Sequence, residues 1–230
     1  MGKPTMDDVA EKAGVSRALV SLVMRDSPRV SDHSREKVQA AAAELGYRPN
    51  QSARNLASGR TNTIGVMLND LHNPFFTEMA EGAAEQADAH GLHLLINSGW
   101  QRPDGEIPAI ESFLSLRTDG LLLGSPGLSA DVLEEYAAQV PVVSVSHYSR
   151  PSAFDTVSND EAKGAALIVD HLIDLGHSRI AHIDAGDGAG GRERRSAFSA
   201  AMIAQGMAPI IVEGDFNEQG GYDGARRLME

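Results

Sequence analysis

The sequence predicts an all-α helix-turn-helix domain with a hinge helix, followed by an α/β domain built on parallel sheets. Helical segments, each beginning with a capping residue, fill residues 5–45. From Thr61 onward, short apolar runs alternate with helical stretches, which is typical of parallel strands joined by crossover helices. The charge changes at the same boundary. Residues 1–60 carry 10 Lys and Arg against 7 Asp and Glu, whereas residues 61–230 carry 10 against 25.

The charge division favours a nucleic-acid-binding segment at the N-terminus. The net charge is +3 over the first 60 residues and −15 over the rest, although the whole chain carries −12. A mildly basic segment before an acidic domain fits a small DNA-binding module attached to a larger domain. Chance unevenness of charge is the alternative.

Two short helices with a tight turn between them are predicted near the N-terminus. Thr5 is placed to cap a helix over residues 6–13, and Gly14 follows as a C-cap, because glycine adopts the left-handed conformation without steric cost. Ser16 is then placed to cap a second helix over residues 17–24. The pair is a helix-turn-helix with a turn of Gly-Val-Ser.

Two further helices are expected before residue 60. Ser31 caps a helix that runs to about Leu45, with apolar residues recurring on one face. Asn50 begins a fourth helix that ends near Gly59. This last helix has only about two turns, and isolated helices shorter than about 12 residues are marginal in water. We therefore expect it to form only when a partner orders it.

These segments carry a family resemblance. The runs MDDVAEKAGVSRALVSLVM and RVSDHSREKVQAAAAELGYRPNQSARNLASGRT resemble the N-terminal part of the LacI/GalR (lactose-repressor) family, almost without gaps over about 60 residues. The resemblance implies a sequence-specific DNA-binding transcriptional regulator, with repression favoured over activation, which a small-molecule effector controls. It divides the chain into a helix-turn-helix DNA-binding domain at 1–49, a hinge helix and linker at 50–60, and an effector-binding domain at 61–230.

The resemblance also implies DNA contacts at ten positions. Arg17 is the best base reader, because a guanidinium can hydrogen-bond guanine through two donors. Tyr47 and Asn50 correspond to positions that contact backbone phosphates, and Arg25, which stands where Asn is common, is expected to restore such a contact. Leu56 matches the leucine that enters the minor groove and kinks the duplex. The full set is Thr5, Ser16, Arg17, Ala18, Ser21, Leu22, Arg25, Tyr47, Asn50 and Leu56.

Two residues of the second helix depart from the family pattern. Leu19 and Leu22 stand where the family usually has Thr and Arg. We expect both leucines to point outward, because Val20, Val23 and Met24 already supply a buried face. An outward leucine can contact a thymine methyl but cannot replace the bond of an arginine to guanine. The usual half-site of the family should therefore not be assumed.

Apolar runs and helical stretches alternate through the second domain. The expected strands lie at 64–68, 92–98, 120–124, 141–146, 179–184 and 210–214, and the expected helices at 76–90, 106–116, 131–139, 161–175 and 192–205. Such sheets bind ligands at the carboxyl ends of their strands. The resemblance continues here and implies a periplasmic-binding-protein-like fold, in which two subdomains enclose an effector cleft.

The resemblance places effector contacts at strand ends and loops. The implied residues are Asn69, Phe75, Phe76, Ser146, Asp160, Arg194 and Phe216. Phe75 and Phe76 are expected in a loop, with loop packing as the alternative, and Asp160 has helix capping as its alternative. Ser146 stands where the family often has Asp. The effector is expected to be a sugar or a nucleobase.

Other classes of function receive little support. The chain has no Cys, which excludes disulfides and thiolate metal sites. His171, His177 and His182 have no metal-ligand spacing, and neither a P-loop nor a Gly-x-Ser-x-Gly elbow occurs. We therefore expect no enzyme activity, metal or cofactor. Without a signal peptide or an apolar run long enough to span a membrane, a cytoplasmic protein is the simplest expectation.

The family resemblance sets two further expectations. The chain should bind a near-palindromic operator in double-stranded DNA as a homodimer, because a two-fold protein matches a two-fold site. The chain stops within GGYDGARRLME, which has the pattern of a helix start, whereas relatives continue for about a hundred residues. We therefore expect an incomplete second subdomain, with a complete short variant as the alternative. A solute-binding protein with the same α/β fold is the rival function.

Overall fold

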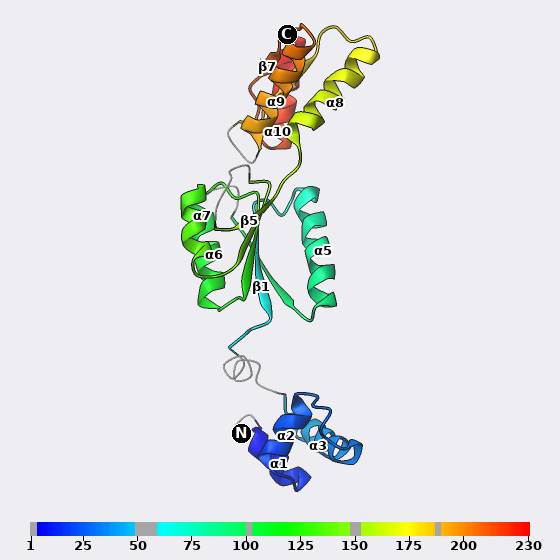
Figure 1. The fold of residues 1–230 in the computed structure, drawn as a ribbon, viewed down its shortest axis with the longest axis vertical. Coiled ribbons are helices and arrows are strands. Elements are labelled where there is room, and N and C mark those ends of the chain that lie inside the picture. The colour runs from blue at the N-terminus through cyan, green and yellow to red at the C-terminus, as the bar shows by residue number, and fades with distance from the viewer. Residues whose placement is uncertain (1–3, 49–58, 100–102, 148–152, 187–189) are drawn as a thin grey trace. The chain divides into compact units, whose positions relative to one another are not determined.

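The computed structural model describes residues 4–48, 59–99, 103–147, 153–186 and 190–230 (Figure 1). Its contacts divide the chain into two compact units, Met1–Thr61 and Asn62–Glu230. The first is helical and the second contains both of the parallel sheets described below. The hinge helix expected from Asn50, including Leu56, lies outside the described residues.

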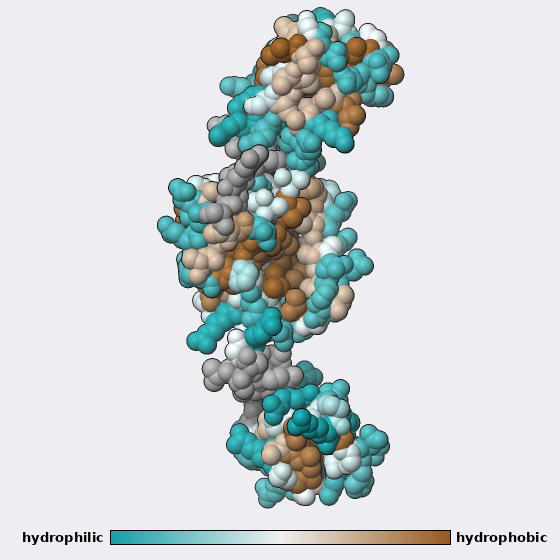
Figure 2. Space-filling model, in the orientation of Figure 1, coloured by the Kyte–Doolittle hydropathy of each residue, from teal (hydrophilic) through white to brown (hydrophobic). Residues whose placement is uncertain are grey.

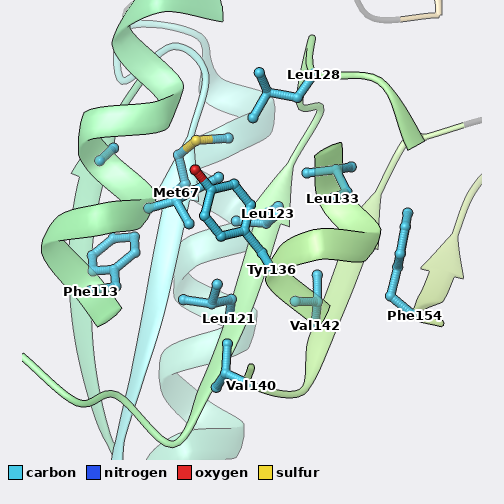
Figure 3. Packing of buried hydrophobic residues seen from close by; sticks show 12 residues of the cluster. Met67, Phe113, Leu121, Leu123, Leu128, Leu133, Tyr136, Val140, Val142 and Phe154 are labelled. Carbon is cyan, nitrogen blue, oxygen red and sulfur yellow. The ribbon is translucent and has the colours of Figure 1, made fainter. Parts of the chain in front are cut away.

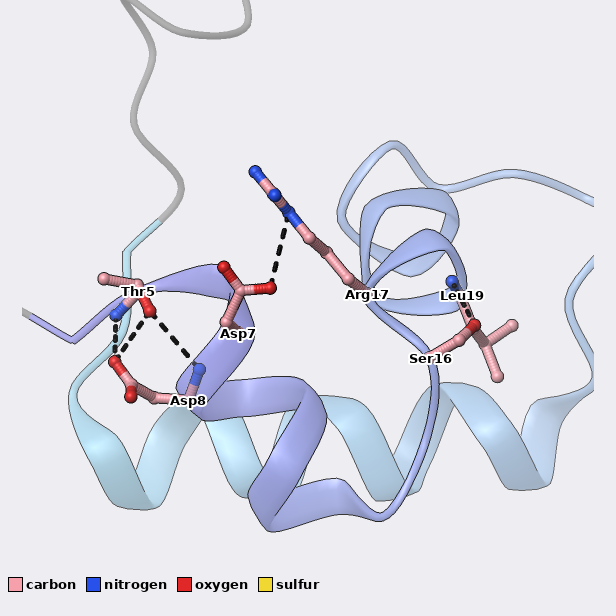
Figure 4. Close-up of polar contacts among 6 residues, drawn as sticks. All are labelled: Thr5, Asp7, Asp8, Ser16, Arg17 and Leu19. Carbon is pink, nitrogen blue, oxygen red and sulfur yellow. Dashed lines mark hydrogen bonds and ion pairs between the residues drawn. The ribbon is translucent and has the colours of Figure 1, made fainter.

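The three N-terminal helices have the predicted bounds: α1 (Met6–Ala13), α2 (Arg17–Met24) and α3 (Asp32–Leu45). Thr5 and Asp8 form a capping box, in which the Thr5 hydroxyl accepts from the Asp8 amide while the Asp8 carboxylate accepts from the Thr5 amide at 2.7 Å (Figure 4). Gly14 ends α1 in the left-handed conformation with φ of 62°. The predicted caps Thr5, Gly14 and Ser16 are therefore confirmed.

The core of the helical unit is made of small and β-branched residues. Val9, Val20 and Val38 are fully buried at its centre. The prediction that Leu19 and Leu22 point outward is wrong in part, because both are half-buried and pack against this core. Helix α2 has only eight residues and packs against both α1 and α3, so few of its side chains are fully exposed to solvent. Only part of each leucine is left for a base.

The larger sheet has five parallel strands in the order β2-β1-β3-β4-β5. The strands are β1 (Thr63–Leu68), β2 (His93–Ser98), β3 (Gly120–Gly124), β4 (Val142–Val145) and β5 (Asp155–Val157). The helices between them are α5 (Pro74–Ala89), α6 (Pro103–Ser115) and α7 (Ala130–Ala137). Figure 1 shows α5 on one side of the sheet and α6 with α7 on the other. The sequence analysis missed β5, a three-residue strand without buried side chains.

The main core lies between this sheet and the helices α6 and α7 (Figure 3). Phe113 is its largest fully buried side chain, and it packs with Leu121 and Leu123 of β3. Gly65 in β1 leaves the room for that ring, since a Cβ there would lie 2.5 Å from the Phe113 Cγ. This close packing fixes α6 against the centre of the sheet.

The second sheet is smaller. Its two strands, β6 (Ala181–Ile183) and β7 (Ile210–Val212), pair in parallel. They are flanked by α8 (Glu161–Asp174), α9 (Gly191–Ala204) and α10 (Glu218–Met229). The expected parallel pairing is confirmed. Both strands are short and only half-buried at most.

Apolar surface remains visible on the α/β unit. In Figure 2 a brown strip lies between α5 and the pair α6 and α7, where Figure 1 shows the five-stranded sheet. Large apolar side chains of α8, including Leu167 and Ile168, are more than half exposed. Across the part of the chain that the structure describes, no helix has the length and apolar character that a membrane span needs.

The cap of α2 gives a stability prediction. Replacing Ser16 by alanine removes the oxygen that accepts from the Leu19 amide at 3.2 Å. We expect a loss of about 1 kcal/mol in the free energy of unfolding of the helical unit, measured by urea titration followed by circular dichroism. Ser16→Asp, which keeps a capping oxygen, serves as the control and should retain most of that stability. Equal losses in both variants would contradict the role of the cap.

Candidate functional site

The start of α2 presents a polar, exposed surface. Ser16, Arg17 and Ala18 are all exposed, as a surface that contacts DNA requires. Arg17 Nε lies 3.6 Å from an Asp7 carboxylate oxygen, and both side chains are about two-thirds exposed (Figure 4). Exposed ion pairs of this kind contribute less than about 1 kcal/mol, so the guanidinium can exchange Asp7 for another partner at small cost.

The remaining residues predicted to contact DNA differ in how many contacts they already make within the helical unit. Arg25 folds back along α2, donating from Nη2 to the Ser21 hydroxyl at 2.9 Å and from Nε to the Ser21 carbonyl at 3.2 Å. Tyr47 is half-buried and packs against the helical core. Thr5 holds the capping box, whose hydrogen bonds keep the pKa of Asp8 below its usual value. Asn50 and Leu56 lie outside the described residues.

A second group of predicted residues lies at the carboxyl ends of the strands in the five-stranded sheet. Asn69 follows β1, and its Nδ2 donates to the Ser125 carbonyl at 2.9 Å. Asn69 Oδ1 is buried and has no hydrogen-bond partner among the described residues. Ser125 and Ser146 follow β3 and β4 in the left-handed region, with φ of 52° and 58°. This edge therefore has a non-helical, ordered backbone beside an unsatisfied polar atom.

The two predicted aromatic contacts behave differently from expectation. Phe75 and Phe76 occupy the first turn of α5, so the prediction that they lie in a loop is wrong. Phe76 is 2% exposed and packs with Val66 and Leu68 of β1, which leaves no surface for a ligand. Phe75 is 51% exposed and meets Phe76 edge-on. Packing against the sheet explains Phe76, while Phe75 keeps a free face.

A cleft of about 810 Å³ joins the loop after β1 to the loop after β7. It brings Phe216, a predicted residue, into one site with side chains that the sequence analysis did not single out. Its lining consists of Asp70, His72, Asn73, Pro74, Asp215, Phe216, Asn217, Glu218 and Gln219. The family resemblance implied a cleft between the two subdomains, but the sequence did not single out the polar residues of these two loops that line it.

Arg194 and Phe216 are also brought together. The Arg194 Cζ lies 5.9 Å from the centre of the Phe216 ring, at the outer range of a cation–π contact. Arg194 Nε donates to a Glu161 carboxylate oxygen at 3.0 Å, and both residues are half-buried. Asp160 caps α8 by accepting from the Lys163 amide at 2.9 Å. Helix capping, the alternative considered for Asp160, is thus what its side chain does in this structure.

An ion pair with a buried acid lies next to Arg194 in the chain. Arg195 Nη1 is 2.5 Å from a carboxylate oxygen of Asp184, which follows β6 and is 4% exposed. The other oxygen of Asp184 has no hydrogen-bond partner among the described residues. His182, two residues earlier, stacks on Phe198, and burial lowers its pKa. Asp184 could not be singled out from the sequence, because an isolated acid at the end of a strand gives no signal of its partner.

A metal centre finds no support in the part of the chain that the structure describes. His171 lies on α8, His177 follows the end of that helix, and His182 lies within β6, as expected. No group of three or more His, Asp or Glu side chains in those residues is arranged to hold a metal ion.

Comparison with known protein families matches both units. Residues 5–50 match the family of bacterial regulatory proteins of the lacI type. Residues 61–230 match the family of periplasmic binding proteins and sugar-binding domains of LacI regulators. The first match covers the helix-turn-helix unit, and the second covers the α/β unit.

Full-length relatives and solved structures agree with these matches. The chain is 34% identical to the regulator DegA of Bacillus subtilis over 99% of its length and 70% of the relative. It is 33% identical to the ribose operon repressor of Escherichia coli over 98% of its length and 70% of that protein. A lac repressor dimer bound to operator and an anti-inducer superposes with a TM-score of 0.88 at 28% identity, over 99% of this chain and 70% of that one. The chain therefore belongs to the LacI family of bacterial transcriptional regulators.

Proposed function

We propose that this regulator binds operator DNA through residues 1–49 and responds to a sugar-like effector in the cleft of its α/β unit. The capped helix-turn-helix, with Ser16, Arg17 and Ala18 exposed at the start of α2, is the observation that carries the proposal. The lac repressor dimer, which has the same fold, is bound to operator. A solute-binding protein would have no use for such a unit, so this rival is not favoured.

In this proposal Arg17 reads a base and the neighbouring residues fix the register. Arg17 is exposed and held only by a weak ion pair. Ser21 and Arg25 form one hydrogen-bonded pair on α2 that can present a cation to a phosphate. Leu22 and Leu19 offer part of their apolar surface, which suits a thymine methyl. Thr5, Ser16, Ala18, Tyr47 and Asn50 complete the proposed DNA-binding set.

Dimerisation and the hinge extend the proposal. Two copies would bind a near-palindromic site, since one small helical unit makes few base contacts. Residues 50–60 would form the hinge, and Leu56 would enter the minor groove from each subunit. Because its target is the operator of a bacterial gene, the protein would act in the cytoplasm and would perform no enzymatic reaction.

The proposed effector site combines the carboxyl ends of the strands in the five-stranded sheet with the residues beside the two-stranded sheet. Asn69 and Ser146 lie at the end of the first sheet, and Arg194 with Phe216 lies beside the second. Phe75 adds an exposed aromatic face, and Asp160 lies at the start of α8. Hydroxyl-rich rings suit this mixture of carboxylates, amides and an aromatic face. A related regulator was solved in complex with cellobiose.

Regulation requires the effector to favour one arrangement of the dimer over another. A coupling free energy of about 1–3 kcal/mol changes operator affinity by roughly 5- to 150-fold. Repression is the direction that the name of one relative, the ribose operon repressor, favours. An inducer would lower the operator affinity by this factor, and a corepressor would raise it.

Base reading by Arg17 can be tested directly. A preferred operator is first selected from randomised palindromes, and affinities are then measured by gel shift at several salt concentrations. Arg17→Ala should lose about 1–3 kcal/mol of discrimination at one base pair of each half-site. The control Arg29→Ala, which removes another exposed cation of the same unit, should weaken selected and random DNA alike. Unchanged discrimination in Arg17→Ala would exclude the reading role.

The wedge role of Leu56 makes a separate prediction. Leu56→Ala should reduce the bend of the selected operator, measured by energy transfer between dyes at the two DNA ends. The dependence of affinity on salt should stay the same, because leucine neutralises no phosphate. Leu71→Ala, an exposed leucine in the α/β unit, is the control. A bend that is the same in Leu56→Ala as in the parent protein would rule the wedge out.

Effector binding can be followed by thermal unfolding with single pentoses, hexoses, disaccharides and nucleobases, including D-ribose and cellobiose. A ligand at 100 times its Kd should stabilise the α/β unit by about 2.7 kcal/mol. Arg194→Ala should abolish that shift, because Arg194 stands beside Phe216 in the proposed site. Arg226→Ala, an exposed arginine on α10, should leave it unchanged. A ligand whose shift survives Arg194→Ala would place the effector elsewhere.

A further inference from the structure

One buried carboxylate of the α/β unit has no role in the proposed function. Glu106 lies in the first turn of α6 and is 1% exposed, which makes it one of the most deeply buried side chains of the protein. A carboxylate so placed loses its hydration and needs strong compensating partners. No ion pair to Glu106 occurs among the residues that the structure describes, so its partners must be sought in the backbone.

Those partners belong to the loop between β3 and α7. The Gly127 amide donates to both carboxylate oxygens of Glu106, at 2.9 and 3.0 Å. Amide hydrogen bonds to a charged acceptor are stronger than those between neutral groups. Glu106 therefore holds the Gly127 amide, a loop group that would otherwise need water as its partner.

The end of β2 is shaped around the same side chain. A Cβ on Gly99 would lie 2.6 Å from the Glu106 Cγ, and one on Gly105 would lie 2.5 Å from the Gly99 carbonyl oxygen. Only glycine fits at either position without movement of its neighbours. The first turn of α6 is thus packed tightly onto the strand end, and Glu106 is held where it reaches across to the loop.

The loop fixed by Glu106 contacts the proposed effector-binding edge at two points. The Ser125 carbonyl accepts from Asn69 Nδ2 at 2.9 Å, and the Leu128 carbonyl lies 3.4 Å from His147 Nε2. Asn69 follows β1, and His147 follows Ser146 after β4. Residues 125–128 therefore connect the buried carboxylate with side chains at two different strand ends.

Burial at this site has a thermodynamic cost. Desolvation raises the pKa of Glu106, and the amides of Gly127 and Leu128 offset this only in part. An acid with a raised pKa in the folded state stabilises the fold most when protonated, and this stability is lost as pH rises through the raised pKa. A buried acid with a raised pKa, held by a loop amide and without a role in the packing of the core, is a candidate for a functional role.

We propose that Glu106 is a positioning residue, whose carboxylate holds the loop 125–128 and, through it, Asn69 and His147 at the effector-binding edge. That this edge binds an effector rests on the proposed function. The contacts from Glu106 through the loop to Asn69 and His147 do not depend on it. In the part of the chain that the structure describes, the Gly127 amide hydrogen-bonds the carboxylate, and the His147 ring lies against the Leu128 carbonyl of the same loop.

The experiment is a pH titration of the full ¹⁵N-labelled chain by NMR. In the unsubstituted protein the Gly127 and Leu128 amides should follow one titration, with a midpoint above that of an exposed glutamate. Glu106→Gln should abolish it and raise the hydrogen-exchange rate of the Gly127 amide at least about tenfold, because a charge-assisted bond is lost. Glu85→Gln, the same change at an exposed position on α5, should leave both unchanged.

A second readout separates positioning from simple folding stability. Glu106→Gln should shift the Asn69 side-chain amide and the His147 ring resonances while the melting temperature does not fall, because a buried charge has been removed. His147→Gln identifies any part of the titration that belongs to the histidine. The proposal would be refuted if the chemical shifts of the loop amides did not change with pH in the unsubstituted chain. It would also be refuted if the Asn69 and His147 resonances had the same chemical shifts in Glu106→Gln as in the unsubstituted chain. A failed sugar screen alters none of these signals and so refutes only the proposed function.

Discussion

The parallel pairing of β1 with β2 and β3 is the constraint on which the α/β unit depends. Parallel neighbours need crossover connections, so helices must cover both faces of the sheet. Every strand then ends at the same edge, and the loops after β1, β3 and β4 are brought together there whatever their sequence. Close packing of Phe113 on Gly65 holds α6 in place, and with it the carboxylate that reaches this edge.

Local signals in the sequence were sufficient for most of the elements. Caps at Thr5, Ser16 and Ser31 placed the starts of three helices correctly, because a capping side chain acts within one turn. Burial was harder to predict, because it depends on neighbours from distant segments. Leu22 and Phe76 were assigned to binding surfaces, yet one packs in part and the other wholly into a core. Apolar residues fit a ligand site and a core equally well.

The residues that line the cleft were even harder to predict from the sequence. Arg194 and Phe216 could be named from the resemblance, whereas their proximity follows only from the fold. Asp184 and Glu106 gave no pattern at all, since a buried acid looks like a surface acid until its surroundings are known. Both are deeply buried, but Asp184 pairs with Arg195 while Glu106 is held by backbone amides. The two acids therefore respond differently to the same burial.

That difference bears on how a regulator can respond to a ligand. An acid paired with arginine has a partner that can itself move or be replaced, so the contact can be exchanged. An acid whose two oxygens both accept from one backbone amide, as in Glu106, is tied to the position of that loop. A site that must recognise a ligand and also change its arrangement needs contacts of both kinds. The half near β6 holds the ion pairs of Arg194 with Glu161 and of Arg195 with Asp184, whereas the edge near β3 holds Glu106 on a backbone amide, so the two halves differ in the kind of contact that fixes their acids.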